Sequence, residues 1–305
     1  MSLLCWNVQE LGNQRIVQEL AKFVWVQDPS ILFLAETWAD EARLRKLCND
    51  LQFDELWVVG RVTRVGGLAL LWKSSVDIDV DSTSFNHIDA IINKGKEDAW
   101  RFTGIYGFPE ACRKPETWEL LCGLKQKFCL PWICVGDFNE ILRGYEKLGG
   151  VPRRESEMRG FRDMVDECEL VDLGYVGHKF TWCGRRSGGV VLERLDWAFA
   201  NTSWLVLNPV TWVQHFRAHS SDHNPIIISP EGIPACRNKP FRFEQMWLKE
   251  EGCGDTVKAT WEANSDIGTL PMVSQKIKNC GVWLTEWSRH SFGSIRRQLE
   301  EKLRN

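Results

Sequence analysis

The sequence has no run of about 18 consecutive apolar residues, so nothing in it predicts a membrane-spanning helix. Its first residues, Met-Ser-Leu-Leu, lack the basic region with which a signal peptide begins, and we expect a protein that is not secreted. The 11 cysteines include no C-x-x-C pair, which argues against a structural zinc site. Free thiols suit a reducing compartment, and we therefore expect a nuclear or cytoplasmic protein.

An excess of positive charge is also missing. Lysine and arginine number 38 and aspartate and glutamate 41, so the net charge of −3 provides no overall field to attract a polyanion. The balance is −5 over residues 1–230 (26 basic, 31 acidic) and +2 over residues 231–305 (12 basic, 10 acidic). Any contact with nucleic acid must therefore come from a local group of basic residues.

The hydrophobic pattern of residues 1–230 predicts a mixed α/β domain. Short β-branched and aromatic runs predict strands at 3–8, 31–36, 57–59, 68–72, 76–80, 87–92, 101–106, 132–136, 180–182, 194–198, 210–216 and 226–228. Apolar residues at helical spacing predict helices at 14–27, 41–51, 115–128 and 156–169. Many strands linked by short turns, with few helices, predict a four-layered sandwich of the α/β (α+β) class, in which two packed sheets carry helices on their outer faces.

A second segment is expected after the last strand. Residues 229–234, Ser-Pro-Glu-Gly-Ile-Pro, break helices and strands, so we expect the first domain to span residues 1–230. Residues 231–305 carry apolar stripes at helical spacing and no strand pattern, which predicts a C-terminal helical extension.

Polar side chains end several of the predicted strands. Asn7 and Glu36 end two apolar runs, Asp137 and Asn139 follow a third, and an Asp222-His223 pair precedes the last. Each has an ordinary explanation by itself, as a helix cap, a surface carboxylate, turn formers or a half-buried histidine. Polar groups gathered at strand ends also make a site that rigid elements support and solvent reaches.

Metal-assisted phosphodiester hydrolysis uses these residue types. A hard divalent ion takes oxygen ligands such as Glu36, with Asn7 nearby, and Mg²⁺ typically keeps several waters beside one or two carboxylates. We therefore expect Mg²⁺, or Mn²⁺ in its place, as the cofactor. Asp137 can orient and deprotonate a water, and Asn139 can hold that geometry.

The same reaction needs a group that stabilises the charge developing on the phosphoryl oxygens. A cationic His223 can do so, with Asp196 fixing its tautomer and raising its pKa. Metal ligand, base and charge stabiliser are thus all represented among the polar residues of the first domain.

Six short segments in chain order carry a family resemblance: CWNV at 5–8, LAETW at 34–38, IYG at 105–107, GDFNE at 136–140, RLDW at 194–197 and SDHNP at 221–225. Together they resemble the endonuclease/exonuclease/phosphatase family, and within it the endonuclease domain of plant-type LINE (non-LTR) retrotransposons. Residues 180–182, Phe-Thr-Trp, also resemble a hairpin segment of the apurinic/apyrimidinic endonucleases. The resemblance implies the two-sheet sandwich of that family, with the site where strand ends meet.

The resemblance also implies metal-binding roles. Glu36 would be the principal ligand, and Asn7 would support the metal and phosphate end of the site. Asp222 would lie close enough to the metal to bind it directly or through water.

Further roles implied by the resemblance concern the phosphate and the attacking water. Tyr106 would contact the scissile phosphate, Asp137 would position or deprotonate the water, and Asn139 would orient both. Asp196 would pair with His223.

The region after residue 240 extends the resemblance. Residues 241–248, FRFEQMWL, resemble the connector that joins the endonuclease to a reverse transcriptase in plant-type elements. Because the sequence stops at Asn305, before a polymerase, we expect a fragment, a truncated copy or a domesticated remnant. The expected partner is DNA, with element RNA or a reverse transcriptase in a full-length parent, and we expect a monomer.

Several functions stay open at this point. The retained polar positions favour an active Mg²⁺-dependent DNA-nicking endonuclease. The alternatives are a catalytically silent remnant or binding module, and a phosphodiesterase acting on abasic DNA or another phosphoester. Residues 183–189 are expected to form a loop in which Arg185 and Arg186 contact DNA, or a solvated hairpin with two incidental arginines.

Overall fold

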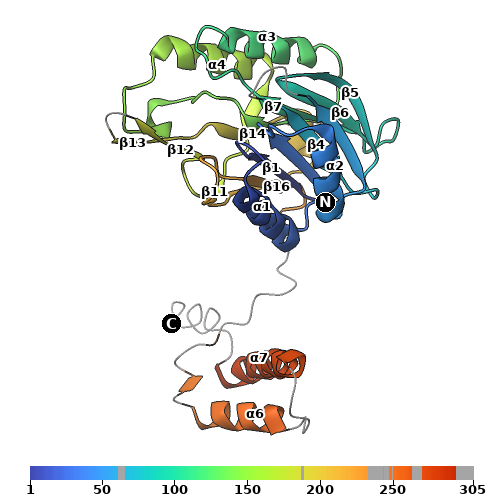
Figure 1. Ribbon diagram of the computed structural model, residues 1–305, viewed down its shortest axis with the longest axis vertical. Coiled ribbons are helices and arrows are strands. Elements are labelled where there is room, and N and C mark those ends of the chain that lie inside the picture. The colour runs from blue at the N-terminus through green and yellow to red at the C-terminus, as the bar shows by residue number, and fades with distance from the viewer. Residues whose placement is uncertain are drawn as a thin grey trace, which may run out of the picture. The chain divides into compact units, whose positions relative to one another are not determined.

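The chain forms two compact units in a computed structural model, Met1–Pro234 and Ala235–Asn305 (Figure 1). The structure describes residues 1–60, 66–186, 189–232, 243, 247–248, 250–262 and 270–292. The sequence places the domain boundary at residue 230, and the division between the units follows residue 234.

Two mixed sheets and one small sheet build the first unit. The seven-stranded sheet has the order β11-β15-β16-β1-β2-β4-β3, with strands Val176–Gly177, Trp212–His215, Ile226–Ser229, Leu3–Asn7, Ile31–Ala35, Leu68–Trp72 and Glu55–Val59. The six-stranded sheet has the order β10-β14-β8-β7-β6-β5, with strands Leu170–Asp172, Asp196–Asn201, Trp132–Asp137, Trp100–Tyr106, His87–Ile92 and Ile78–Ser84. The small sheet has the order β12-β13-β9, with strands Trp182–Arg186, Gly189–Glu193 and Lys147–Leu148.

Helices cover both outer faces of the two large sheets (Figure 1). Helices α1 (Gln14–Gln27) and α2 (Glu41–Asp50) pack on the seven-stranded sheet, and α3 (Lys114–Lys125) and α4 (Glu155–Glu167) pack on the six-stranded sheet. A third apolar cluster fills the space between the sheets, with side chains from both, such as Phe33 and Phe102. A short helix α5 spans Thr202–Leu207, and a 3₁₀ turn spans Gly144–Glu146. This arrangement confirms the four-layered sandwich.

Burial explains the composition of the strands. All five residues of β1 and all five of β2 are buried, because these central strands have a packed layer on each face, and their sequences are accordingly almost continuously apolar. Strand β5 lies at the edge of the six-stranded sheet, and its residues alternate between partly buried and exposed. Its sequence, IDVDSTS, is correspondingly more polar than those of β1 and β2.

The hairpin around Arg185 differs from the expectation. Strand β12 begins at Trp182 and continues to Arg186, pairing with β13 from Trp182↔Glu193 to Arg186↔Gly189. The expected loop at 183–189 is therefore wrong for residues 183–186, and residues 187–188 lie outside the described part. Gly184 lies within the strand, where a side chain has no room, because a Cβ there would lie 2.2 Å from the Trp182 ring.

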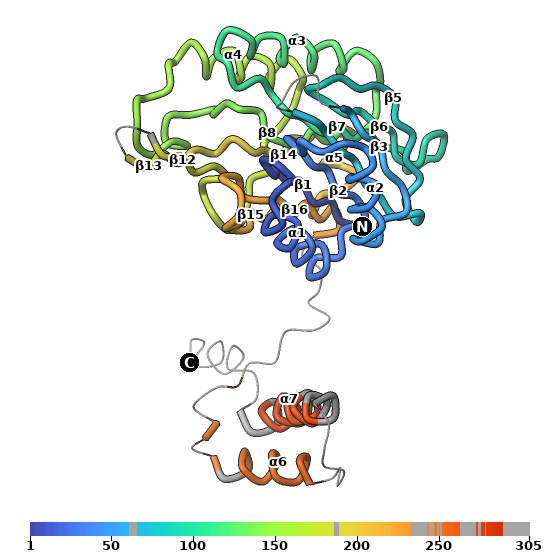
Figure 2. The backbone as a smooth tube through the Cα atoms, viewed as in Figure 1, coloured from blue at the N-terminus to red at the C-terminus, as the bar shows by residue number. Residues whose placement is uncertain are grey.

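The second unit is helical. Helices α6 (Glu251–Glu262) and α7 (Leu270–Phe292) pack against each other around Trp247, Cys253 and Leu284, which confirms the helical extension (Figure 2). Of the connector segment 241–248, only Phe243, Trp247 and Leu248 belong to the described residues. None of the described helices combines the length and the apolar character needed to cross a bilayer.

We predict that the first unit folds without the second. A chain ending at Pro234 should unfold cooperatively, because the three apolar clusters of the sandwich are formed entirely by residues before that point. Urea unfolding followed by tryptophan fluorescence and circular dichroism measures this. Non-coincident or non-cooperative transitions in the shortened chain, with a cooperative transition in the full chain, would mean that the boundary is misplaced.

Two buried histidines predict a loss of stability in acid. Burial lowers the pKa of His87 to about 4, although the charge of Asp89 opposes this shift. Burial also lowers the pKa of His215 to about 4, although the hydrogen bond to the His178 carbonyl opposes it. The unfolded chain binds a proton near pH 6.5 and the folded chain does not, so the free energy of unfolding should fall as pH drops from 6.5 towards 4. Each histidine should contribute about 2 to 3 kcal/mol to that loss at pH 4.5.

The measurement is the difference in unfolding free energy between pH 7 and pH 4.5 for each protein. In His215→Gln this difference should shrink by about 2 to 3 kcal/mol, whereas His219→Gln, which alters an exposed histidine, serves as the matched control. An unchanged pH difference in His215→Gln would show that His215 is protonated in the fold.

Candidate active site

Strand order brings the polar residues from the sequence motifs to one edge of the sandwich. Strands β1 and β2 are parallel, so Asn7 at the end of β1 lies beside the end of β2, which Glu36 follows directly. Strands β7 and β8 are also parallel, and Tyr106 pairs with Asp137 at their shared end. Asp196 begins the antiparallel β14 opposite Asp137. The ends of one parallel pair from each sheet therefore contribute to the same site.

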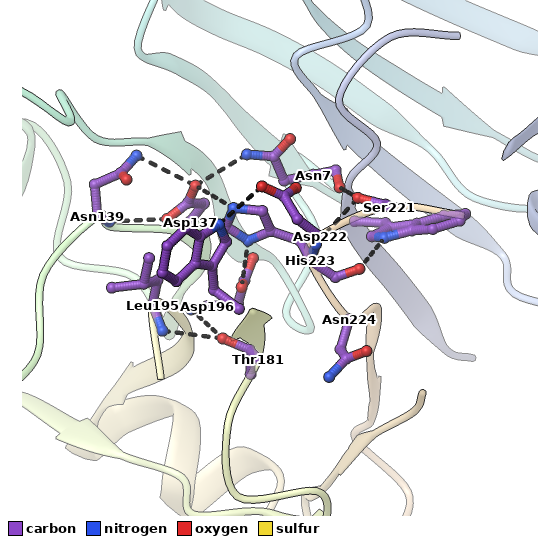
Figure 3. Close-up of polar contacts among 12 residues, drawn as sticks. Asn7, Asp137, Asn139, Thr181, Leu195, Asp196, Ser221, Asp222, His223 and Asn224 are labelled. Atoms are coloured by element: carbon purple, nitrogen blue, oxygen red, sulfur yellow. Dashed lines mark hydrogen bonds and ion pairs between the residues drawn. The ribbon is translucent and has the colours of Figure 1, made fainter. Parts of the chain in front are cut away.

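One buried amide connects the two sheets. Asn7 Nδ2 donates to Asp137 Oδ2 at 3.0 Å (Figure 3). The same Nδ2 donates to Glu36 Oε1 at 2.9 Å, while Asn7 Oδ1 accepts from the backbone of Gln9 at 3.2 Å. Carboxylates only accept hydrogen bonds, so this network assigns the amide nitrogen to the side of the two acids. Asn7 uses both amide protons to hold two carboxylates from different sheets.

His223 lies between two buried carboxylates. Its Nδ1 donates to Asp196 Oδ2 at 2.8 Å, and its Nε2 lies 3.6 Å from Asp137 Oδ2 (Figure 3). All three side chains are at most 6% exposed. Asp196 is itself fixed by Thr181, whose hydroxyl oxygen accepts from the backbone N–H groups of Leu195 and Asp196, both at 2.9 Å.

The close packing of these groups shifts their pKa values. Burial by itself lowers the pKa of His223, but the carboxylates of Asp196 and Asp137 outweigh it and raise the pKa above its ordinary value. Burial raises the pKa of Asp137, His223 opposes that rise, and Asp196 adds to it. His223 is therefore a cation at neutral pH, with its Nε2 proton on the side of Asp137.

Asp137 and Asn139 form one hydrogen-bonded turn at the end of β8. Asp137 Oδ1 accepts from the Asn139 backbone at 2.9 Å, and Asn139 Nδ2 donates to Gly107 O at 2.9 Å and to Asp137 Oδ2 at 3.2 Å. Asn139 has φ 55°, in the left-handed region that asparagine tolerates. Asn139 therefore forms a turn, as its residue type suggests, and the same turn orients the carboxylate of Asp137.

Glu36 occupies a strained backbone position. Its φ is 51°, a left-handed value that costs of order 1–3 kcal/mol for a residue other than glycine and persists only where neighbours enforce it. Two backbone hydrogen bonds hold this conformation. Glu10 N donates to Glu36 O at 2.9 Å, and the backbone N–H of Thr37 donates to Gly67 O at 3.1 Å. Gly67, at φ 91°, has no room for a side chain, since a Cβ would lie 2.6 Å from Thr37 Oγ1.

Tyr106 lies beside Glu36. Burial raises the pKa of Tyr106 far above its ordinary value, and the charges of Glu36 and Asp137 and a hydrogen bond to Glu36 raise it further. The phenol is therefore protonated throughout the physiological range and serves as a hydrogen-bond donor.

Glu19, which the sequence motifs do not include, holds the loop that carries Asp222 and His223. Its carboxylate on α1 accepts from the backbone of His219 at 3.0 Å and of Ser220 at 2.9 Å, and from the Ser220 hydroxyl. Ser221 ties the same loop to β1 by donating to Asn7 O at 3.0 Å. These contacts join residues about 200 positions apart, and glutamate on an amphipathic helix is otherwise an ordinary surface residue.

The residues that could hold a metal ion fall into two groups. Asp137, Asp196 and His223 offer ligand atoms within 4.8 Å of one another. However, a protonated imidazole has no free lone pair, and His223 is committed to the two acids. Glu36 offers the carboxylate oxygens that hard divalent ions prefer, whereas Asn7 presents its amide nitrogen to Glu36 and its oxygen to Gln9 N, so Asn7 orients the Glu36 carboxylate.

Asp222 supplies a further oxygen. Its Oδ2 accepts from Trp182 Nε1 at 2.9 Å, whereas its buried Oδ1 has no hydrogen-bond partner in the part of the chain that the structure describes. A buried carboxylate oxygen without a partner needs an ion or a water to satisfy it. The donor set at this edge therefore fits a hard divalent ion, although Asp222 makes no hydrogen bond to Glu36 or Asn7 among the described residues.

The two candidate DNA-binding arginines lie on the hairpin. Arg185 is exposed on β12 and pairs through its backbone with Val190. The backbone of Arg186 belongs to β12, but its side chain lies outside the described part. Among the described residues, Arg185 makes no side-chain hydrogen bond to the cluster around Asp137.

Comparisons with known proteins agree with this geometry. The pattern of the Endonuclease/Exonuclease/phosphatase family matches residues 4–223. No curated protein matches the chain. Among solved structures, the endonuclease domain of TRAS1, a telomere-specific non-LTR retrotransposon, is 17% identical with a TM-score of 0.57, over 74% of this chain and 96% of that chain.

Two further solved structures share the fold. The 3′ phosphatase NExo from Neisseria, bound to a product DNA hairpin, is 17% identical with a TM-score of 0.58, over 75% of this chain and 98% of that chain. An AP endonuclease from Archaeoglobus fulgidus is 14% identical with a TM-score of 0.58, again over 75% and 98%. The two-sheet sandwich, the strand-end cluster and the match over residues 4–223 together show that the chain belongs to the Endonuclease/Exonuclease/phosphatase family.

Proposed function

We propose that the chain is a divalent-metal-dependent phosphodiester hydrolase that nicks DNA and derives from the endonuclease of a LINE-type retrotransposon. The observation that carries the proposal is one continuous row of contacts, listed from one end to the other as Glu36, Asn7, Asp137, His223 and Asp196. A carboxylate suited to a hard ion, a carboxylate base and a cationic imidazole are thus within reach of a single phosphate. Membership of the family supports phosphoester chemistry, and the sequence motifs support the LINE origin.

Glu36, with Asn7 beside it, would hold Mg²⁺ or Mn²⁺. When bound, the ion supplies Lewis-acid polarisation of the phosphate. The left-handed backbone at Glu36 fixes the direction of its carboxylate before any ligand arrives. Asp222, whose buried Oδ1 lacks a partner among the described residues, would add a second carboxylate through water.

Asp137 would accept a proton from the attacking water. Its pKa, raised by burial, makes it a stronger base than an exposed aspartate. Oδ1 accepts a single hydrogen bond within the described residues, from Asn139 N, which leaves a lone pair for a water. Asn139 keeps the carboxylate in that orientation by bonding to both of its oxygens.

His223 and Tyr106 would stabilise the charge that develops on the phosphoryl oxygens. Asp196 holds Nδ1–H and so directs the Nε2–H of the cationic ring towards the site. Tyr106 stays protonated and can donate a hydrogen bond to a phosphate oxygen. Arg185, exposed on the hairpin, would contact the backbone of the bound DNA.

We predict that Glu36→Gln abolishes metal-dependent nicking. Loss of the main carboxylate ligand removes several kcal/mol of charge stabilisation, so the rate should fall by at least about 10²-fold. Conversion of supercoiled plasmid to the nicked form, with Mg²⁺ and with chelator, measures the rate.

Glu41→Gln is the matched control, because Glu41 is an exposed glutamate on α2 paired with Arg45. It should nick at the parent rate, and both variants should keep the parent unfolding transition. Parent-like nicking by Glu36→Gln in Mg²⁺ would show that the metal assignment is wrong.

We predict that His223 and Asp196 act as a unit. His223→Ala should lower the rate by about 10²- to 10⁴-fold, since the group that stabilises the phosphoryl charge is lost. Asp196→Asn should also be impaired, but the double variant should be no slower than His223→Ala, because the principal contact of the Asp196 side chain is the hydrogen bond that it accepts from the imidazole. Single-turnover nicking rates of the three variants measure this. If the two losses multiply in the double variant, Asp196 has a role of its own.

A further inference from the structure

A groove of about 450 Å³ opens next to Asp222, on a part of the surface for which the proposed function has no use. One wall is the segment from His178 to Cys183, and the other is the loop from Arg217 to Asn224. Asp222 belongs both to this groove and to the loop that carries His223, so one side of the groove adjoins a residue of the candidate active site.

The two walls of the groove are bonded to each other. Asn224 N donates to Thr181 O at 2.7 Å, Asn224 Nδ2 donates to Phe180 O at 3.0 Å, and Cys183 N donates to Asp222 O at 2.9 Å. Glu19 fixes the outer part of the loop through His219 and Ser220. The groove therefore exists before a ligand binds, which reduces the entropy that binding must overcome.

Exposed cations stand on both walls. The Nζ atom of Lys179 lies 5.4 Å from the ring of Tyr145 and 5.4 Å from the ring of Phe180. Arg217 belongs to the loop that forms the opposite wall. Within the described residues, neither cation has an acidic partner at ion-pair distance, in contrast to Lys94 and Lys96, which pair with Asp79 and Asp77. In a chain with a net charge of −3, two cations without carboxylate partners on facing walls make a local anion-binding surface.

The wall from His178 to Cys183 also supplies aromatic surface. Phe180 and Trp182 both line the groove there and are partly buried. Aromatic surface in a groove with two cations suits a ligand that has a flat apolar ring and a phosphate, since bases stack on aromatic side chains and phosphates bind lysine and arginine. Its volume lies within the range of about 300–1,000 Å³ that small-ligand sites occupy.

We propose that this groove binds one nucleotide of the DNA strand beside the phosphodiester that is cleaved. Lys179 and Arg217 bind its phosphate from the two walls, and Phe180 and Trp182 contact its sugar or base. The proposal rests on the proposed function for the position of the cleaved bond, but DNA binding by the groove can be measured without cleavage.

The test is the affinity of the full chain for a dye-labelled DNA duplex, measured by fluorescence anisotropy in chelator at several salt concentrations. Lys179→Ala/Arg217→Ala should raise the Kd at least tenfold and lower the log–log salt slope by about 1.8, since each lost phosphate contact removes about 0.9. Lys179→Arg/Arg217→Lys should restore both values. Lys94→Ala/Lys96→Ala, in the turn at the other end of β6 and β7 from Tyr106, should leave them unchanged.

A parent-like Kd and salt slope in Lys179→Ala/Arg217→Ala would overturn the proposal, as would a parent chain that does not bind the duplex. The position of the groove is tested by plasmid nicking, in which the half-saturating DNA concentration of the double variant should rise in the same ratio as the Kd. A weaker Kd without that rise would overturn the placement beside the cleaved bond. If the parent chain binds DNA through these cations and does not nick, the groove stands and the proposed function fails.

Discussion

His223 lies between the carboxylates of Asp137 and Asp196, and a charge buried at that depth without partners would cost several kcal/mol. The fold is arranged to keep these three groups together. Asp137 ends β8, Asp196 begins β14 directly opposite, and the loop that carries His223 is tied to α1 by Glu19 and to β1 by Ser221. A shift in the register of β8 against β14 would separate the two acids and leave the imidazole without its charge partners.

The second constraint is the junction of the two sheets. Asn7 is the final residue of a strand in one sheet, yet its amide donates to Asp137 in the other sheet as well as to Glu36. The strained backbone at Glu36, enforced by the loop at Gly67, aims a carboxylate at this junction. One amide group therefore holds the candidate metal ligand Glu36 and the candidate base Asp137 close to each other, through a hydrogen bond to each.

Much of this organisation could be predicted from the sequence. The buried runs before Asn7, Glu36 and Asp137 predicted strands, and the ends of parallel strands meet at one edge of a sheet. The pairing of His223 with Asp196 followed from a family resemblance. What the sequence could not predict are contacts between distant segments, such as Glu19 with the loop at His219. The prediction of a loop at residues 183–189 was wrong for residues 183–186, which continue the strand, and Gly184 makes room there for the Trp182 ring.

The central claim is that Asp137, His223 and Asp196 form one buried charged cluster, in which His223 hydrogen-bonds to Asp196 and lies 3.6 Å from Asp137, and that Glu36, oriented by Asn7, would hold the metal beside it. The most direct measurement is anomalous diffraction from a crystal of the full chain soaked in Mn²⁺. The account predicts a Mn²⁺ peak next to the Glu36 carboxylate, with the contact between His223 and Asp196 intact. A peak among Asp137, Asp196 and His223, with the imidazole acting as a ligand, would contradict it.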